Sequence, residues 1–427
     1  MMEYQHSVSL DVEKCKGCTS CLHHCPTEAI RIRERHAVID ALRCIDCGEC
    51  IRVCPHQAKK AVTDSLLDLQ KFKWKIALPA PSLYSQFNHL TDVDFVLQGL
   101  MDIGFDDVFE VSRGAELVTA RTRQYLKDPK IAKPAISSAC PAIVRLIALR
   151  FPALMDNVVK LLPPMEVAAT LAREQALKDH PEFKPEDIGV CFLSPCPAKM
   201  SYVKNGLPGY KSQVDLVVAF KDVYFLLVSE MKHSKRPKTL SESGMIGIGW
   251  ASSGGESQAL FNDTYLAADG IDNVIKVLDQ IESEALPNLE FIELNACPGG
   301  CVGGALSLVN PFISKARLQT LRRYLPVSQN FIPKGEEQIP SWYFVKDMGT
   351  YRPLNKLSDN IGESMKMLAE IRKLTETLPG HDCGACGAPT CRAFAEDVVK
   401  GNSEISDCLL IHADEVKAFV RTLESQK

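Results

Sequence analysis

The sequence lacks the features that would place it in a membrane or on nucleic acid. Its apolar runs, such as VDLVVAF and VYFLLV, fall well short of the roughly 18 residues that a membrane-spanning helix needs. The net charge is only −4, which gives no reason to expect nucleic-acid binding. Low-complexity segments and an N-terminal signal peptide are also missing. We therefore expect a cytoplasmic protein that spans no membrane and reaches one only through a partner.

Cysteine is abundant, and the first cysteines repeat one spacing. The first two groups are Cys15, Cys18, Cys21 and Cys25, followed by Pro26, and Cys44, Cys47, Cys50 and Cys54, followed by Pro55. Each group reads C-x2-C-x2-C-x3-C-P, which is the pattern of bacterial two-cluster ferredoxins. Because the fourth cysteine of each run reaches the other cluster, we expect Cys54 to complete the first cluster and Cys25 the second.

Two other uses of these cysteines fit the sequence less well. Disulfides suit small secreted proteins, whereas this chain has 427 residues and a composition that is 24% charged, as in cytosolic enzymes. Zinc ribbons also contain C-x2-C pairs, but two tandem copies with trailing prolines favour 4Fe-4S clusters.

A further group of four cysteines lies near the C-terminus. It consists of Cys383, Cys386, Cys391 and Cys408, with the spacing C-x2-C-x4-C-x16-C. Gly384 and Gly387 allow tight turns that direct backbone N–H groups toward a cluster, and Thr390 can cap a helix from about Arg392 to Lys400. The group resembles the small single-cubane domain of several anaerobic redox proteins, while a zinc knuckle remains an alternative.

The five remaining cysteines form no local motif. Cys140 lies in ISSACPAIV, Cys191 and Cys196 lie in GVCFLSPCPAKM, and Cys297 and Cys301 lie in IELNACPGGCVGGA. In each segment an apolar, strand-like run leads to a cysteine in a turn rich in Pro or Gly. All except Cys191 are consistent with convergence on one centre, although the spacing does not prove it. Cys191 stands in the middle of an apolar run and is expected to be a small buried hydrophobe.

These three segments resemble the three active-site signatures of iron-only (FeFe) hydrogenases: a Cys-Pro turn, an x-P-C-x-x-K turn and an A-C-P-G-G-C-x-x-G-G turn. With Ala80-Pro81-Ser82 and the ferredoxin pattern, the resemblance covers most of residues 1 to about 355. It implies an H-cluster, in which a 4Fe-4S subcluster joins a two-iron subcluster that carries CO, cyanide and a dithiolate amine. The implied subcluster ligands are Cys140, Cys196, Cys297 and Cys301, the last of which also forms the bridge.

Cyanide ligands need hydrogen-bond donors, and the sequence offers two candidates. Lys199 follows Cys196 by three residues, and a buried ammonium would be costly unless it met such an anion. We expect Lys199 to bind one cyanide, the alternative being a surface lysine. Ser82, with the amide of Ala80 or of a neighbour of Pro81, is expected to line the second cyanide. Ser82 could equally be an ordinary turn residue.

Several positions depart from the pattern of catalytic family members. Those members carry a proton-passing cysteine where this sequence has Ala139, and relay carboxylates where it has Arg121 and Gln124. None of the three residues can exchange a proton near neutral pH. Three further departures lie in the pocket: Ser194 for a methionine, Tyr202 for a glutamate and Asn295 for a methionine. The departures affect proton delivery and leave the cluster ligands intact.

Losing a general acid typically costs about a hundredfold to ten-thousandfold in rate, so we expect slow, reversible H2 oxidation. The combination resembles sensory hydrogenases that lack a PAS domain and end in an extra four-cysteine module. It implies three 4Fe-4S clusters that relay electrons from the H-cluster, or pass a redox signal, to a protein partner. The alternative is a hydrogenase-like protein without the two-iron subcluster, which acts in electron transfer or cluster assembly. Retention of both Lys199 and Cys301 argues against it.

The predicted fold is α/β. We expect a two-cluster ferredoxin-like domain over 1–62, a large hydrogenase-type α/β domain over 63–355 with helices flanking its sheets, and a linker helix with a small helical 4Fe-4S module over 356–427. Apolar runs such as KIALP, IGVCFLSP, MIGIGW and LEFIELNA alternate with amphipathic helices such as VDFVLQGLMDIG and PMEVAATLAREQALK. The sequence leaves the partner and the oligomeric state open, a homodimer included.

Overall fold

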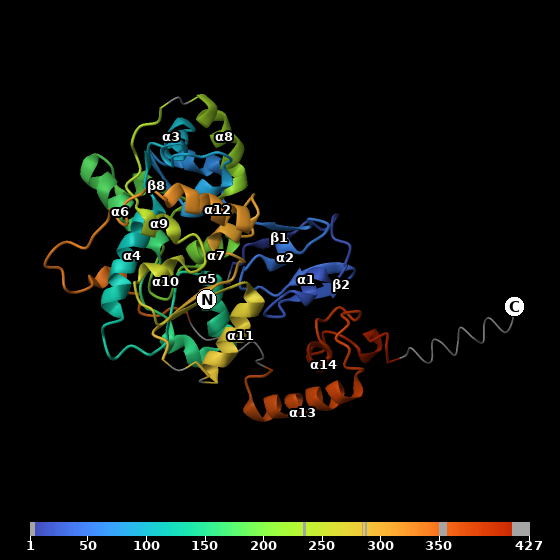
Figure 1. Ribbon diagram of the computed structural model, residues 1–427. Helices are drawn as coiled ribbons and strands as arrows, with labels where there is room; N and C mark the ends of the chain where they lie inside the picture. Colours follow the sequence, from blue (N-terminus) through green and yellow to red (C-terminus); the bar gives the residue numbers. More distant parts are fainter. Residues whose placement is uncertain (1–4, 234–235, 284, 287, 350–356, 412–427) are drawn as a thin grey trace, which may run out of the picture. The chain divides into compact units, whose positions relative to one another are not determined.

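The computed structural model describes residues 5–233, 236–283, 285–286, 288–349 and 357–411 (Figure 1). The chain divides into two compact units. The larger unit comprises Met1–Val8, Ile45–Gly48 and Ala61–Tyr351, and the smaller one comprises Ser9–Cys44, Glu49–Lys60 and Arg352–Lys427. The smaller unit therefore combines segments from both ends of the sequence. The domain limits at 62 and 355 remain predictions.

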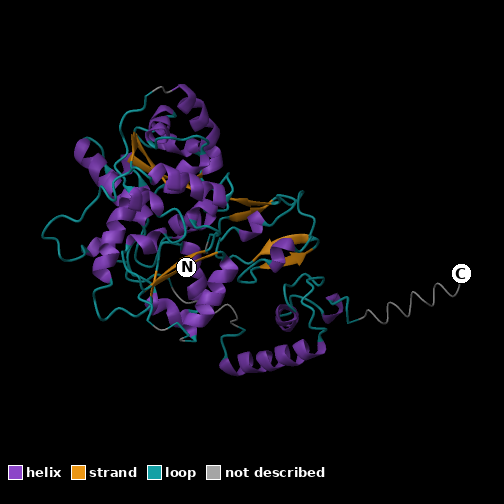
Figure 2. Ribbon diagram, in the orientation of Figure 1, coloured by secondary structure: helices purple, strands orange, loops and turns teal. Residues whose placement is uncertain are grey.

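Two parallel sheets form the framework of the larger unit (Figure 2). The four-stranded sheet has the order β6-β5-β8-β9, with β5 at Trp74–Pro79, β6 at Asp107–Val108, β8 at Ile188–Ser194 and β9 at Leu216–Ala219. The three-stranded sheet has the order β10-β11-β7, with β7 at Ala135–Ile136, β10 at Tyr265–Asp269 and β11 at Phe291–Asn295. All these pairs are parallel, which confirms the predicted α/β class.

Helices separate the strands of this unit. They are α3 (Asp94–Asp102), α4 (Val111–Tyr125), α5 (Pro141–Arg150), α6 (Pro164–Asp179), α7 (Pro197–Asn205), α8 (Phe220–His233), α9 (Met245–Gly249), α10 (Gly255–Ala259), α11 (Ile271–Glu282) and α12 (Pro311–Arg322). Short 3-10 turns add η1 (Leu66–Lys71), η2 (Pro81–Gln86), η3 (Pro152–Asn157), η4 (Pro185–Asp187), η5 (Cys301–Gly303) and η6 (Ser341–Tyr343). The predicted amphipathic helices correspond to α3 and α6.

The core of this unit surrounds the four-stranded sheet. Every residue of β8 is buried, because a central parallel strand has both faces covered, and this explains its continuous apolar run. Cys191, in the middle of β8, is fully buried in this core, as predicted. Among the residues that the structure describes, no helix is both long and apolar enough to cross a bilayer.

One apolar run forms a different element from the one expected. The sequence pattern places MIGIGW among the strands, but Met245–Gly249 forms helix α9. Helix α9 packs on α4, and a Cβ atom at Gly247 would lie 2.3 Å from the carbonyl oxygen of Ser112. Gly247 therefore permits a close approach of the two helices that any residue with a side chain would prevent.

The smaller unit contains short elements around its cysteines. Its ferredoxin-like part holds α1 (Ser20–His23), α2 (Glu49–Arg52) and an antiparallel pair of β2 (Ile30–Arg33) with β3 (His36–Ile39), and its C-terminal part holds α13 (Ile361–Thr377), α14 (Cys391–Val399) and η7 (Ile405–Asp407). Strands β1 (Val8–Leu10) and β4 (Lys59–Ala61) form a separate two-stranded sheet. The predicted linker helix is α13, which packs on α14 around Ile371 and Phe394.

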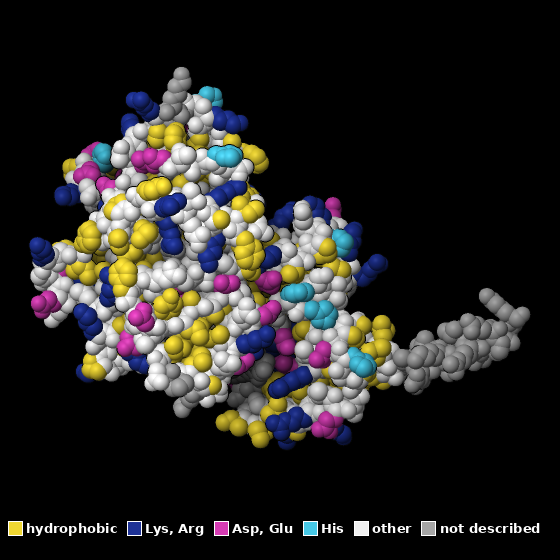
Figure 3. Space-filling view, viewed as in Figure 1, with side chains coloured by type: hydrophobic (Ala, Val, Ile, Leu, Met, Phe, Trp, Pro, Cys, Tyr) yellow, Lys and Arg dark blue, Asp and Glu magenta, His cyan; other side chains and the backbone are white. Residues whose placement is uncertain are grey.

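The surface mixes charges of both signs. On the face in Figure 3, Lys and Arg side chains alternate with Asp and Glu side chains. This mixture agrees with the small net charge of −4.

Candidate metal centres

Three loops of the larger unit carry the cysteines of the hydrogenase-type signatures. Cys140 is the N-cap of α5, and Cys196 is the N-cap of α7, directly after β8. Cys297 follows β11, and Cys301 begins η5. Each of the two capping cysteines therefore lies at the positive end of a helix of nine or ten residues, where a thiolate is favoured.

Direct contacts bring the three loops together. The Nζ atom of Lys199, in the second loop, donates to the carbonyl oxygen of Ala139 in the first loop at 3.3 Å. The amide of Leu306, after the third loop, donates to the carbonyl oxygen of Pro195 at 2.9 Å. A Cβ atom at Gly304 would lie only 2.4 Å from that same oxygen, so the glycine is needed for the approach. The loops converge, as their shared design suggested.

The four thiols form one electrostatic group. Burial raises the pKa of Cys196, and Cys297 and Cys140 raise it further, while Lys199 opposes them. Burial likewise raises the pKa of Cys301 to about 12, with Lys199 lowering it and the other thiols raising it. Four thiolates in so dry a site need bound cations to offset their repulsion, and the iron ions of a cubane supply that charge. The residues therefore fit an iron–sulfur cluster.

Ser82 is a buried hydrogen-bond donor. It lies in η2, directly after β5, and is 0% exposed. Its Oγ atom makes no hydrogen bond to any residue that the structure describes. A buried hydroxyl left unpaired costs about 1–3 kcal/mol, so this atom is suited to a polar ligand in the pocket. The amide of Ala80 donates to the carbonyl oxygen of Leu193 at 3.3 Å, and its expected role beside a cyanide remains a prediction. Pro81 has no N–H to offer.

The residues at the expected relay positions are engaged with each other. Arg121 donates to the side-chain oxygen of Gln124 at 3.0 Å and forms an ion pair with Glu336. The Arg121 side chain is only 4% exposed, and its guanidinium lies 5.3 Å from the ring centre of Tyr343. These contacts make Arg121 and Gln124 part of the packing of α4, with no ionisable carboxylate at either position.

The other departures are also accommodated locally. Ser194 accepts from the amide of Cys196 and donates to its carbonyl oxygen, both at 3.1 Å. Asn295 donates to Glu293 at 2.9 Å. The hydroxyl of Tyr202 is buried and, among the described residues, has no hydrogen-bond partner. Ser194 therefore shapes the cysteine loop itself.

Sequence reasoning missed two buried carboxylates beside this pocket. Glu256 lies in α10 and accepts from the hydroxyl of Ser137 at 2.6 Å, and Ser137 in turn accepts from the amide of Ala139 at 3.1 Å. Burial, followed by the charge of Glu293, raises the pKa of Glu256 to about 8, while Ser137 and Lys199 oppose the shift. Burial also raises the pKa of Glu293. The one available signal was an acidic residue inside the apolar run LEFIELNA.

The smaller unit contains a complete ligand set. Cys15, Cys18, Cys21 and Cys54 line one cavity together with Gly17, Ile32 and Lys59. The structure thus places Cys54 with the first three cysteines, the combination that the ferredoxin pattern predicts. The Sγ atom of Cys54 accepts from the amide of Ala58 at 3.3 Å, and that of Cys25 accepts from the amide of Ala29 at 3.2 Å. Of the second set, Cys25, Cys44 and Cys50 belong to this unit and Cys47 to the larger one.

The C-terminal cysteines line a cavity of their own. Cys383, Cys386, Cys391 and Cys408 surround it, with Leu378 and Phe394 at its apolar side. Gly384 and Gly387 have φ angles of +73° and +81°, so both turns require glycine. Thr390 caps α14 by accepting from the amide of Ala393 at 3.0 Å, as predicted. The arrangement presents four sulfur ligands to one centre.

Comparison with known families agrees with this layout. The family model described as "Iron only hydrogenase large subunit, C-terminal domain" matches residues 73–267 and 257–305. A 4Fe-4S dicluster domain matches residues 7–55, and an Fe-S cluster model matches residues 378–410. These matches confirm the predicted succession of ferredoxin-like, hydrogenase-type and C-terminal Fe-S parts.

Individual known proteins are similar to different shares of the chain. The periplasmic [Fe] hydrogenase large subunit of Nitratidesulfovibrio vulgaris is 26% identical over 388 residues, which cover 74% of this chain and 90% of that protein. One component of the ion-translocating oxidoreductase complex of Rhodobacter capsulatus is 45% identical over 38 residues, only 9% of this chain and 20% of that protein. A solved variant of [FeFe]-hydrogenase HydA1 from Chlamydomonas reinhardtii superimposes with a TM-score of 0.47 at 16% identity, covering 60% of this chain and 86% of that one.

Proposed function

The chain belongs to the iron-only hydrogenase family, and from this premise we propose that it binds H2 at an H-cluster and oxidises it slowly and reversibly. The observation that carries the proposal is the convergence of the three cysteine loops next to Lys199 and to the Ser82 hydroxyl, which has no hydrogen-bond partner among the described residues. Thiolates, an ammonium and a buried hydroxyl are the groups that such a cofactor needs from the protein.

In this proposal each pocket residue has a separate role. Cys140, Cys196 and Cys297 would hold a 4Fe-4S subcluster, and Cys301 would hold both that subcluster and the two-iron subcluster. When bound, the two-iron subcluster would supply the chemistry that splits or forms H2. Lys199 and Ser82 would donate hydrogen bonds to its two cyanide ligands. Ala139 contributes no proton, because its side chain does not ionise.

We further propose that Glu256 takes over part of the proton handling. Its carboxyl group is joined to the Cys140 loop through the hydroxyl of Ser137, and its raised pKa places its ionisation near neutral pH. A general acid or base works best when its pKa lies near the working pH. Glu256 can therefore hold a proton beside the pocket. It lies in a different segment from Ala139, which occupies the position of the relay cysteine.

The proposal extends to the use of the electrons. Two clusters in the ferredoxin-like part and one in the C-terminal part would connect the pocket to a redox or signalling partner in the cytoplasm. Slow turnover suits sensing, since a sensor needs to respond to H2 and does not need to consume it quickly. The ligand sets at Cys15–Cys54 and Cys383–Cys408 support this role, since each can hold a cluster that accepts and passes on electrons.

Infrared spectroscopy tests the cofactor directly. Full-length protein, matured and purified without oxygen, is expected to show metal-bound CO and cyanide stretches that shift under H2. The variant Lys199→Met should shift the cyanide bands, whereas Lys204→Met, at the far end of the same helix, should leave them unchanged. Full 4Fe-4S loading without any such band would favour the alternative of an electron-transfer or cluster-assembly protein.

A further inference from the structure

Two arginines of the ferredoxin-like part bind one carboxylate of the C-terminal part. The Nε atom of Arg31 lies 2.7 Å from Oδ2 of Asp397, and its Nη2 atom lies 3.3 Å from Oδ1. Arg33 contacts the same carboxylate at 2.6 Å. The Asp397 side chain is 10% exposed, so water does little to screen these pairs. A bidentate arginine fixes the direction of its partner as well as its distance.

A second ion pair lies beside the first. Arg43 donates to Glu396 at 2.8 Å, with side chains that are 11% and 10% exposed. Burial raises the pKa of Glu396, but hydrogen bonds from Lys400 and the charge of Arg43 outweigh it, so the pKa lies below its usual value. Glu396 is therefore ionised at neutral pH. Removing one partner of such a pair leaves the other charge buried and unpaired, so both partners are needed to hold this contact.

Beside these ion pairs, the C-terminal cysteine loop contacts the ferredoxin-like part. The amide of Ile32, whose side chain lines the cavity of Cys15, Cys18, Cys21 and Cys54, donates to the carbonyl oxygen of Gly387 at 2.9 Å. Gly387 directly follows Cys386. The turns at Gly384 and Gly387 are so close to β2 and α1 that added Cβ atoms would lie 2.8 Å from His23 and 2.2 Å from the Ile32 carbonyl oxygen.

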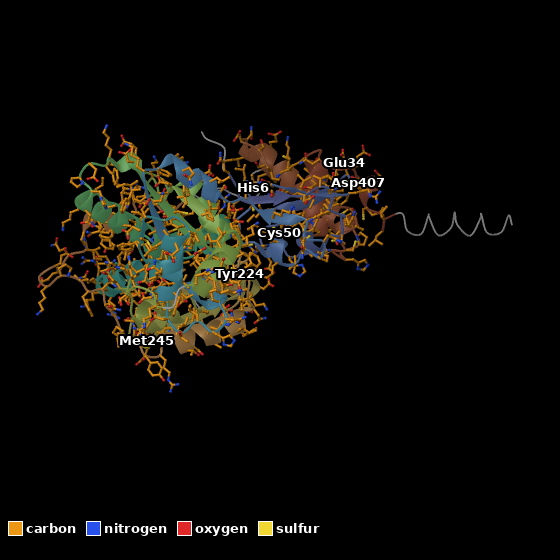
Figure 4. The ribbon with its side chains drawn as sticks, turned by 90° about the horizontal axis from the view of Figure 1, so that it is seen from above. His6, Glu34, Cys50, Tyr224, Met245 and Asp407 are labelled. Carbon is orange, nitrogen blue, oxygen red and sulfur yellow. The ribbon has the colours of Figure 1, made fainter. Side chains whose placement is uncertain are left out.

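Only a few residues therefore separate the cavity of Cys15, Cys18, Cys21 and Cys54 from the cavity of the C-terminal cysteines. On one side Leu22 follows Cys21, and on the other Gly384 follows Cys383; a Cβ atom at Gly384 would lie 3.2 Å from the Leu22 side chain. In Figure 4 the labels Glu34, at the β2–β3 turn, and Asp407, in η7, mark these two parts of the smaller unit. Neither glycine leaves room for a side chain that would separate the loops.

We propose that the Asp397 and Glu396 ion pairs position the C-terminal ligand set as the direct electron-exchange neighbour of the set formed by Cys15, Cys18, Cys21 and Cys54. With 4Fe-4S clusters in both sites, one electron at a time would pass between them, one cluster being oxidised as the other is reduced; no bond would form or break and no proton would move. The inference rests on the iron–sulfur part of the proposed function, but not on the two-iron subcluster.

Electron paramagnetic resonance of full-length, iron-loaded protein without the two-iron subcluster tests the inference. In dithionite-reduced protein, two neighbouring paramagnetic clusters interact, and this interaction falls with the inverse cube of their separation. The signals of the ferredoxin-like clusters are therefore expected to change when Cys391→Ser removes the C-terminal cluster. Identical ferredoxin-like signals in the wild type and in Cys391→Ser would overturn the proposal.

A charge reversal tests the positioning role. Asp397→Arg should abolish the interaction signal at unchanged iron content, and the combination with Arg31→Asp and Arg33→Asp should restore it. Glu370→Arg, an equal change of charge at an exposed site of α13, should leave the signal as in the wild type. Retention of the full signal in Asp397→Arg would overturn the role of the ion pairs.

The two proposals can fail separately. If Asp397→Arg also loses iron, the comparison of wild type with Cys391→Ser still decides whether the clusters are neighbours. Missing CO and cyanide bands in the matured protein would contradict the hydrogenase function and leave this interaction signal untouched.

Discussion

Replacing Glu256 by glutamine gives a direct test of how protons reach the pocket. Glutamine keeps an oxygen that can accept from the Ser137 hydroxyl, which lies 2.6 Å from the carboxylate. The substitution therefore removes the ionisation while it preserves the size and one hydrogen bond of the side chain. Glu293 and Lys199 are the charged groups that act on Glu256, and both stay in place.

The size of the effect follows from the pKa of Glu256, which burial and Glu293 raise to about 8. At neutral pH the carboxyl group is therefore mostly protonated. H2 oxidation needs a proton acceptor, so its rate should rise with pH and level off above about 8. Positioned acids and bases contribute about 10²–10⁴-fold, and we expect Glu256→Gln to lose at least about tenfold of the remaining activity.

The same pKa shift predicts a pH dependence of stability. The folded pKa of Glu256 exceeds its unfolded value, so between about 4.5 and 8 the folded state binds a proton that the unfolded state does not. Stability should therefore fall as pH rises through this window, and Glu256→Gln should remove that part of the slope.

The assay is H2 uptake with a dye acceptor, measured from pH 6 to 9 on protein with matched iron content and infrared bands. Glu282→Gln, at an exposed position of α11, is the control and should behave as the wild type. A Glu256→Gln protein with wild-type turnover and an unchanged pH profile would refute the proton role.

Three further outcomes are expected. Ala139→Cys should raise H2 turnover by about tenfold or more, since it restores an ionisable group next to Cys140, and uptake assays would measure it. Ser82→Ala should shift a cyanide band in the infrared spectrum more than the CO bands, because it removes a buried hydroxyl that has no partner among the described residues. Gly304→Ala should lower the free energy of unfolding by about 1–3 kcal/mol in denaturation experiments, because its Cβ atom would lie 2.4 Å from the Pro195 carbonyl oxygen.

Much of the architecture could be predicted from the sequence, because cysteine spacing and apolar periodicity are local signals. The pairing of Cys54 with the first three cysteines, the cap at Thr390 and the buried strand around Cys191 all follow from a few neighbouring residues. Helix α9 could not be predicted in this way. Gly247 in this helix is explained by its close approach to Ser112, which lies far away in the sequence.

The buried carboxylates and the ion pairs of Arg31 and Arg33 with Asp397 were missed for the same physical reason. Glu256 acquires its raised pKa from Glu293 and from burial, neither of which a local pattern reveals. Arg31 and Asp397 are 366 residues apart, and each by itself looks like an ordinary surface charge. Long-range electrostatic contacts leave no periodic trace in a sequence, whereas metal-ligand spacing does.

The smaller unit draws its residues from both ends of the chain, and this has a consequence for biosynthesis. Arg31 leaves the ribosome 366 residues before Asp397 does. At a synthesis rate of about 5–20 residues per second, Asp397 is made roughly 20–70 s after the arginines that it binds. Until the C-terminal part is made, the amide of Ile32 in β2 lacks the Gly387 carbonyl that it binds in the folded protein, so the first ferredoxin-like ligand set has no neighbour on that side. The order of synthesis thus allows the first ferredoxin-like site to be filled before the C-terminal part closes over it.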